Sequence, residues 1–321
     1  MNRTLYRAAA PAVVLVLALS ACGGGNEEAA GDPTTEPDAT SGEVLVDGSS
    51  TVQPLTAAAG ELFREVVPGV NVSVGTSGTG GGFEVFCQGA TDISNASRPI
   101  KDEEAAACAD AGIEFTELRV ATDALTVVVS AENDFIQCLT TDELATLWAP
   151  EAEGSVTTWD KVNADFPAQT IELYGPGTDS GTFDYFTDEI NGEEGASRTD
   201  YNASEDDNVI VQGVSGSPDA LGYFGYTYFE ENAEALKAVE IDSGEGCVAP
   251  SSETAGDGSY TPLARPLFIY VNNASFAEKA HVAEFVRFYA EQDAEIAEAA
   301  QYIPLNDEQS AELVAAVDAL G

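Results

Sequence analysis

Three segments of the sequence combine, in the same order, a strand-like run, a loop of Gly, Ser and Thr residues, and a helix-like run. A helix N-terminus leaves up to about four backbone N–H groups unpaired and carries about half a positive charge. Hydroxyl groups add donors there, and glycine lets the backbone approach an oxyanion closely. One such loop is usually only a helix cap, but three loops that converge predict an anion site. The segments are residues 44–55 (VLVDGSSTVQPL), 72–86 (VSVGTSGTGGGFEVF) and 171–186 (IELYGPGTDSGTFDYF).

A fourth candidate element is the Ser-rich segment 94–100, which contains Arg98. A guanidinium group offers a planar fork of donors that suits a tetrahedral oxyanion. The alternative is that Arg98 forms a structural ion pair with one of the 56 Asp and Glu residues of the chain. None of the loops has the GxxxxGK[ST] pattern, so a nucleoside triphosphate site would lack its lysine.

The composition disfavours many other kinds of site. The 321 residues include 12 Lys+Arg and 56 Asp+Glu, a formal net charge of −44, so nucleic acids and anionic lipid surfaces would be repelled. A histidine-based catalytic or metal site would depend entirely on His281, the single histidine. An exported phosphatase is an alternative, but Ser180 has no evident base. We therefore expect no catalytic residue, no metal and no cofactor.

The N-terminus is typical of an exported lipoprotein. A basic start precedes an apolar run, residues 8–19, which is too short to span a bilayer as a mature helix. The run ends in a sequence, LSAC, that resembles a bacterial lipobox, so residues 1–21 are predicted to be a signal peptide and Cys22 to be lipidated. An ordinary secretory signal with a chance cysteine is the alternative. Residues 22–42 are predicted to include a disordered tether, which places the protein on the outer face of the cell membrane.

Four cysteines remain after Cys22. An even number in an oxidising compartment favours two disulfide bonds, for which three pairings exist. We prefer Cys87–Cys108 with Cys138–Cys247, because each pair then stays within one lobe of the architecture described below. Four free thiols are the alternative, and the absence of a CxxC pair argues against zinc.

The rest of the chain alternates strand-like and helix-like segments, which predicts an α/β sheet layered by helices. The five glycines among residues 75–82 are predicted to form a loop, with a helix beginning at Phe83. Residues 113–118 and 124–129 are predicted to be two separate strands. Residues 266–271 are predicted to be a strand that is followed by C-terminal helices.

Several motifs together resemble PstS-type phosphate-binding proteins, the solute receptors of phosphate ABC transporters. The resemblance covers nearly the whole body of the chain, in order. The motifs are residues 46–55 (VDGSSTVQPL), 76–80 (TSGTG), 92–98 (DISNASR), 179–183 (DSGTF), 208–214 (NVIVQGV) and 220–226 (ALGYFGY).

The resemblance implies an α/β, two-lobed type II periplasmic-binding-protein fold with a ligand cleft between the lobes. The expected lobes are residues 43–130 with 262–321, and residues 131–261. It also implies a monomer that binds inorganic phosphate and delivers it to ABC permease subunits; the same fold binding sulfate or molybdate is the alternative. The implied phosphate ligands are Ser50, Thr51, Ser77, Gly78, Thr79, Ser97, Arg98, Ser180, Gly181 and Thr182.

Two positions depart from the best-studied branch of this family. That branch has an Asp where this chain has Arg98, and an Arg where this chain has Pro176. The Asp accepts a proton from phosphate and so rejects sulfate, which has none to give. Rejection of sulfate must therefore come from another acceptor here or be weaker, and Arg98 is expected to be the only formal positive charge at the anion.

Overall fold

The computed structural model describes residues 40–178 and 180–321. The predicted signal peptide, Cys22 and most of the predicted tether lie outside these residues. Among the described residues, no helix is both long and apolar enough to cross a bilayer.

The described residues form a nine-stranded sheet and a three-stranded sheet. The strands are β1 (Gly42–Gly48), β2 (Val70–Val74), β3 (Ile93–Ala96), β4 (Phe115–Ser130), β5 (Cys138–Thr140), β6 (Glu172–Gly175), β7 (Asn202–Ala203), β8 (Ala220–Gly225), β9 (Leu236–Ala238), β10 (Glu240–Asp242), β11 (Cys247–Val248) and β12 (Ala264–Asn272). The large sheet has the order β2-β1-β3-β12-β4-β8-β6-β7, with β9 paired to β4, and the small sheet has the order β11-β10-β5.

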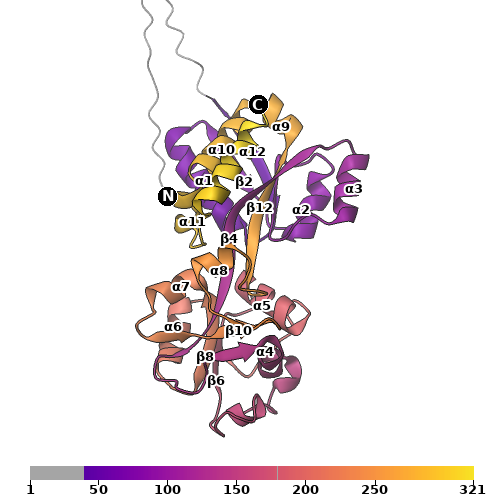
Figure 1. Cartoon of the computed structure of the whole chain (residues 1–321). Coiled ribbons are helices and arrows are strands. Elements are labelled where there is room, and N and C mark those ends of the chain that lie inside the picture. Colours follow the sequence, from indigo (N-terminus) through magenta and orange to yellow (C-terminus); the bar gives the residue numbers. More distant parts are fainter. Residues whose placement is uncertain (1–39, 179) are drawn as a thin grey trace, which may run out of the picture. The chain divides into compact units, whose positions relative to one another are not determined.

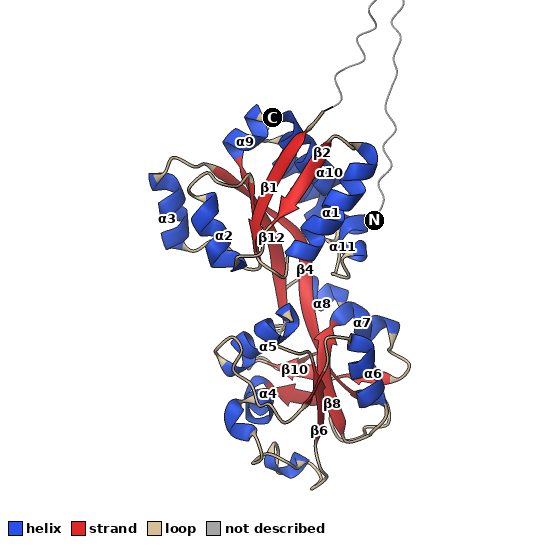
Figure 2. Ribbon diagram, turned by 180° about the vertical axis from the view of Figure 1, so that it is seen from behind, coloured by secondary structure: helices blue, strands red, loops and turns tan. Residues whose placement is uncertain are grey.

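Helices surround the strands in both lobes (Figures 1 and 2). They are α1 (Gln53–Val66), α2 (Gly78–Phe86), α3 (Asp102–Asp110), α4 (Thr141–Trp148), α5 (Gly181–Asn191), α6 (Asp207–Ser215), α7 (Tyr226–Glu231), α8 (Ser252–Gly256), α9 (Asn273–Glu278), α10 (Ala280–Glu291), α11 (Asp293–Ala299) and α12 (Asp307–Asp318). Two short 3₁₀ helices are Pro150–Ala152 and Trp159–Lys161. The alternation of strands and helices confirms the predicted α/β class.

Strand β4 connects two lobes (Figure 2). It pairs with β12 through Ala124, and from Leu125 it pairs with β8. The prediction of two separate strands here was wrong, because the polar residues between them find partners and the strand continues. Asp123 pairs with Arg265 of β12, and Arg119 donates a hydrogen bond to Thr122.

Each lobe has its own hydrophobic core. In the lobe that contains both ends of the described chain, the rings of Phe63 on α1 and Phe285 on α10 pack edge to face, with their centres 5.4 Å apart. In the lobe formed by the middle of the chain, Trp148 packs against Phe186 and Tyr223. Separate cores allow each lobe to be rigid by itself.

The division into lobes at 130/131 and 261/262 stays a proposal. The change of pairing partner within β4 favours placing the first crossover at Ala124–Leu125, earlier than the sequence suggested. The second crossover leads into β12, which pairs along β4 from Ala264 onward.

The glycine-rich stretch 75–82 is not wholly a loop, because α2 begins at Gly78. Helix α2 packs closely on β1 at Gly82, where a Cβ atom would lie 2.4 Å from the Cα atom of Gly48. The glycines therefore allow a close helix–strand contact, and the predicted helix start at Phe83 was wrong.

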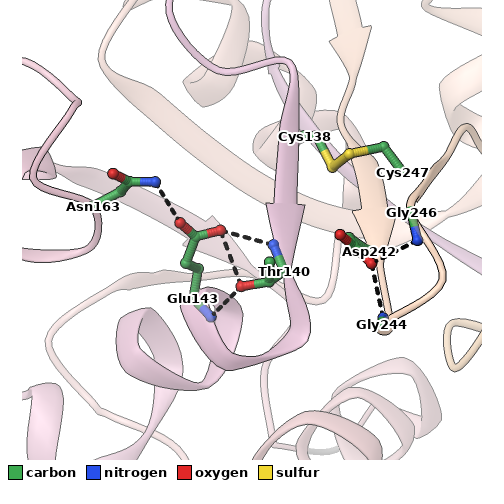
Figure 3. The surroundings of a disulfide bond; sticks show 8 residues. All are labelled: Cys138, Thr140, Glu143, Asn163, Asp242, Gly244, Gly246 and Cys247. Atoms are coloured by element: carbon green, nitrogen blue, oxygen red, sulfur yellow. Dashed lines mark hydrogen bonds between the residues drawn. A yellow bond between two sulfur atoms is a disulfide. The ribbon is translucent and has the colours of Figure 1, made fainter.

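Two disulfide bonds join cysteines of the described residues, with the preferred pairing. Cys87–Cys108 joins the end of α2 to α3, and Cys138–Cys247 joins β5 to β11 on either side of β10. Figure 3 shows the second bond beside a capping network in which Glu143 accepts hydrogen bonds from the backbone and hydroxyl of Thr140 and from Asn163. Each bond lies within one lobe, so neither restricts movement between the lobes.

Candidate ligand-binding site

The strand order explains why the predicted loops meet. β1, β2 and β3 are parallel neighbours, so the loops that follow them leave the same edge of the sheet. A cavity of about 600 Å³ lies where these loops face the start of α5. Of the predicted ligands it is lined by Ser50, Thr51, Ser77, Gly78, Thr79, Ser97, Arg98 and Gly181.

The loop after β1 presents Ser50 and Thr51 to this cavity. The loop is fixed because Ser49 donates its backbone N–H to the carbonyl of Asn95 at 2.9 Å. Val52 is the N-cap of α1, and its side chain makes no capping hydrogen bond. Within the described residues, the backbone N–H groups of Ser50 and Thr51 have no hydrogen-bond partner, so they are available to an anion.

The loop after β2 is hydrogen-bonded to the end of β1 and lies beside the loop after β3. The Oδ1 atom of Asp47 accepts the backbone N–H groups of Gly48, at 2.7 Å, and Ser77, at 2.9 Å. The hydroxyls of Thr79 and Ser97 lie 3.1 Å apart. Ser77 precedes α2 without capping it, so its hydroxyl remains available to a ligand.

The start of α5 approaches the first loop closely. A Cβ atom on Gly181 would lie 3.5 Å from Oγ1 of Thr51 and 4.0 Å from Oγ of Ser50. Ser180 is a helix cap, since its hydroxyl accepts the backbone N–H of Thr182 at 3.2 Å. Thr182 lines an adjoining cavity of about 210 Å³ together with Ser50 and Thr51, and Ser180 lines neither cavity.

Arg98 lines the larger cavity and also forms an ion pair. Its Nη1 and Nη2 atoms each donate to a carboxylate oxygen of Glu104 at 2.8 Å. Burial raises the pKa of Glu104, but the hydrogen bonds from Arg98 and Lys101 outweigh it and hold this pKa below its ordinary value. Arg98 therefore forms the structural ion pair that was considered as the alternative to a ligand role. Its Nε atom nevertheless has no partner within the described residues.

A second cation, Arg265, lines the same cavity and was missed in the sequence. It lies on β12 beside the predicted crossover, which is the signal that could have drawn attention to it. Two positive charges therefore face the cavity among the described residues, where we expected Arg98 alone.

The wall contributed by α5 and the loop after it is acidic. Asp184, Asp188, Glu189 and Glu194 all line the larger cavity. Burial, and then the neighbouring Glu194, raises the pKa of Asp184; burial and then Asp188 raises the pKa of Glu189. An anion is therefore favoured where the helix N-termini and arginines lie, and repelled farther along α5.

The smaller cavity contains another carboxyl group. Burial, reinforced by Asp206 and Glu205, raises the pKa of Asp207 to about 6. His281 lies on α10 beside Gly42 and lines neither cavity.

Two α/β lobes joined by crossover strands, with helix N-termini facing a polar cleft, define a two-lobed solute-binding protein. The family model described as a PBP superfamily domain matches residues 33–293. The chain belongs to the PBP superfamily and, within it, to the family of PstS-type phosphate-binding proteins, as the motifs predicted.

Individual relatives support this assignment. The chain is 46% identical to Protein SphX of Synechocystis sp. over 285 residues, which is 89% of this chain and 81% of that protein. It is 42% identical to the phosphate-binding protein PstS of Staphylococcus saprophyticus over 284 residues, 88% of this chain and 84% of the relative. A solved structure of a possible phosphate binding protein from Planctomyces limnophilus is 44% identical, has a TM-score of 0.83, and aligns over 88% of this chain and 99% of its own.

Proposed function

We propose that this protein binds inorganic phosphate between its lobes and delivers it to the permease of an ABC importer. The observation that carries the proposal is the convergence of the N-termini of α1, α2 and α5 on one cavity that also holds two arginines. Relatives named as phosphate-binding proteins support phosphate as the ligand.

The proposed ligand set is the one given by the sequence. Backbone N–H groups of the loop that contains Thr51 and hydroxyls of Ser50 and Ser77 would replace the water lost by the anion. Thr79 and Ser97 complete the wall beside Arg98. Gly181 leaves room for the anion, and Ser180 can still donate its hydroxyl hydrogen, because its cap bond uses only the oxygen as an acceptor.

Two alternatives make different demands on the site. Sulfate or molybdate would use the same donors, whereas phosphate also offers a proton to a carboxylate. Asp123, Asp184 and Asp207 line the two cavities and are candidate acceptors in place of the missing Asp. A phosphatase would need an activated nucleophile, and the described residues that line the cavities include no histidine.

The location and partners are part of the same proposal. The lipobox-like sequence at Cys22 supports a lipid anchor on the outer face of the cell membrane, which would keep the receptor near its permease. We propose a monomer with no cofactor, whose contact with the membrane is through the anchor alone.

Thermal melting with a panel of oxyanions tests the choice of ligand. A ligand that binds only the native state stabilises it by about 4 kcal/mol at a thousand times its Kd. We expect phosphate and arsenate to raise Tm at low millimolar concentration, and sulfate to raise it less. Stabilisation by sulfate or molybdate with none by phosphate would contradict the proposal.

Replacing Arg98 distinguishes a ligand role from the ion pair with Glu104. Loss of a charge-assisted bond costs roughly 1.5–3 kcal/mol, so Arg98→Ala should weaken phosphate binding about tenfold or more. Arg98→Lys should recover only part of this loss, because an ammonium group lacks the planar fork.

Glu104→Gln is the matched control for Arg98. It removes the ion pair but keeps the guanidinium group, so phosphate binding should persist or tighten. If Arg98 serves only the ion pair, Glu104→Gln and Arg98→Ala should lower Tm alike and leave the Kd of phosphate unchanged.

A further inference from the structure

Arg265 lies on β12 and contacts the other crossover strand, β4, and residues of both lobes. Its Nε atom donates to Oδ2 of Asp123 on β4 at 3.2 Å, and its Nη2 atom donates to Oγ1 of Thr51 at 2.9 Å. Its guanidinium carbon lies 3.6 Å from the ring centre of Tyr185 on α5. The side chain is 18% exposed and lines the larger cavity. These contacts fix the cation where the two lobes meet.

The donors of Arg265 are only partly used. A guanidinium group has five N–H donors. Two of them have acceptors among the described residues, on Asp123 and Thr51, which leaves three without a partner there. By contrast, Glu104 binds both Nη atoms of Arg98. Arg265 therefore has more unpaired donors than Arg98, and its side chain is the more buried of the two.

The hydrogen bond to Thr51 holds the unpaired N–H donors of Arg265 beside the proposed anion site. The hydroxyl oxygen of Thr51 accepts this hydrogen bond from Arg265, so the hydroxyl hydrogen is free to be donated elsewhere. The hydroxyl of Tyr302 donates to the Thr51 carbonyl at 2.7 Å, which holds the loop from the other side. Gly181 faces Oγ1 of the same threonine. The guanidinium of Arg265 is thus hydrogen-bonded to the threonine, in the loop before α1, that faces the first residue of α5.

We propose that Arg265 is a phosphate-binding residue, which donates unpaired Nη hydrogens to the anion while Asp123 and Tyr185 hold its guanidinium group in place. This inference rests on the proposed function. The ligands expected from the loops are thereby joined by a cation, Arg265, which lies on the crossover strand β12. The anion would then bind groups from both lobes and from the strand that joins them.

The competing account is purely structural. Arg265 would then only fasten β12 to β4 through Asp123, and its loss would destabilise the free protein without changing the affinity for phosphate. Arg119 provides a matched control, because it also lies in the crossover region and donates to Thr122 Oγ1 and to the Gly256 carbonyl, but lines neither cavity.

The test is calorimetric titration of the purified protein with phosphate, for the wild type and for Arg265→Gln, Arg265→Lys and Arg119→Gln. We expect Arg265→Gln to weaken binding about thirtyfold or more, which is the range of a lost charge-assisted contact. Arg265→Lys should weaken it about tenfold, since one ammonium cannot hold Asp123, Thr51 and the anion in the same plane. Arg119→Gln should stay within about threefold of wild type, as expected for a residue without ligand contact.

The outcomes separate this inference from the proposed function. A wild-type protein that does not bind phosphate would overturn both. Wild-type binding together with Arg265→Gln and Arg265→Lys within about threefold of wild type would overturn the inference alone. If Arg265→Gln fails to fold, the lysine variant decides, because it keeps the charge; melting with and without phosphate should then show a smaller ligand-induced rise in Tm than wild type.

Discussion

Replacing Gly181 with Asp is expected to abolish phosphate binding without destabilising the free protein. Gly181 is the first residue of α5, and among the described residues beyond its chain neighbours the nearest atom to its Cβ position is Thr51 Oγ1 at 3.5 Å, an ordinary contact distance. An acidic residue in the first turn of a helix is favourable. The new carboxylate would occupy the anion site and bind the donors that phosphate needs.

The expected size of this effect follows from charge repulsion. Two like charges 4 Å apart at a partly buried site repel by about 4 kcal/mol, which corresponds to roughly a thousandfold in Kd. Ala280→Asp is the matched control, because it adds the same charge at the first residue of α10, where the side chain is exposed and lines neither cavity. Phosphate binding by Gly181→Asp at near wild-type affinity would mean that the anion binds elsewhere.

Replacing Gly48 with Ala is expected to cost about 2–6 kcal/mol of unfolding free energy, the sum of backbone strain and overpacking. Gly48 ends β1 with φ at +134°, and a Cβ atom there would lie 2.2 Å from the carbonyl oxygen of Asn95. The backbone at Gly48 and the backbone at Asn95 cannot easily move apart, because β1 and β3 are paired at these two residues. The loss is large compared with a typical total stability of about 5–15 kcal/mol.

Gly112→Ala is the matched control for this prediction. Gly112 also has a positive φ, +74°, but apart from its chain neighbours no atom of the described residues lies within 4 Å of its Cβ position. It should therefore lose only the backbone term, about 1–2 kcal/mol. Urea unfolding of both variants measures the difference, and equal losses would show that the contact with Asn95 is not tight in solution.

The sequence could indicate the loops that line the candidate site, because their signals are local. A strand followed by Gly, Ser and Thr and then by a helix is visible within about a dozen residues, and the parallel order of β1, β2 and β3 brings such loops together. The pairing of the cysteines was also predicted, since each bond joins segments of one lobe.

Arg265 could not be predicted in the same way, because its partners are distant in the chain. It lies 142 residues from Asp123 and 214 residues from Thr51, and only the register of β12 on β4 brings the first pair together. The ion pair of Arg98 was weighed as an alternative, but its partner could not be chosen among 56 acidic residues.

The start of α2 was misplaced for a different reason. Glycines usually interrupt a helix, because they lose the most backbone entropy on folding. At Gly82 the close approach of β1 requires a residue without a side chain, so the tertiary contact outweighs the local preference.

The most direct test of the central claim is calorimetric titration of the purified wild-type protein with inorganic phosphate. The convergence of α1, α2 and α5 on one cavity predicts saturable binding of one phosphate per chain, with a Kd in the micromolar range or tighter. The same titration should give no binding heat with Gly181→Asp. Absence of saturable phosphate binding by the folded wild-type protein up to millimolar concentration would contradict the account.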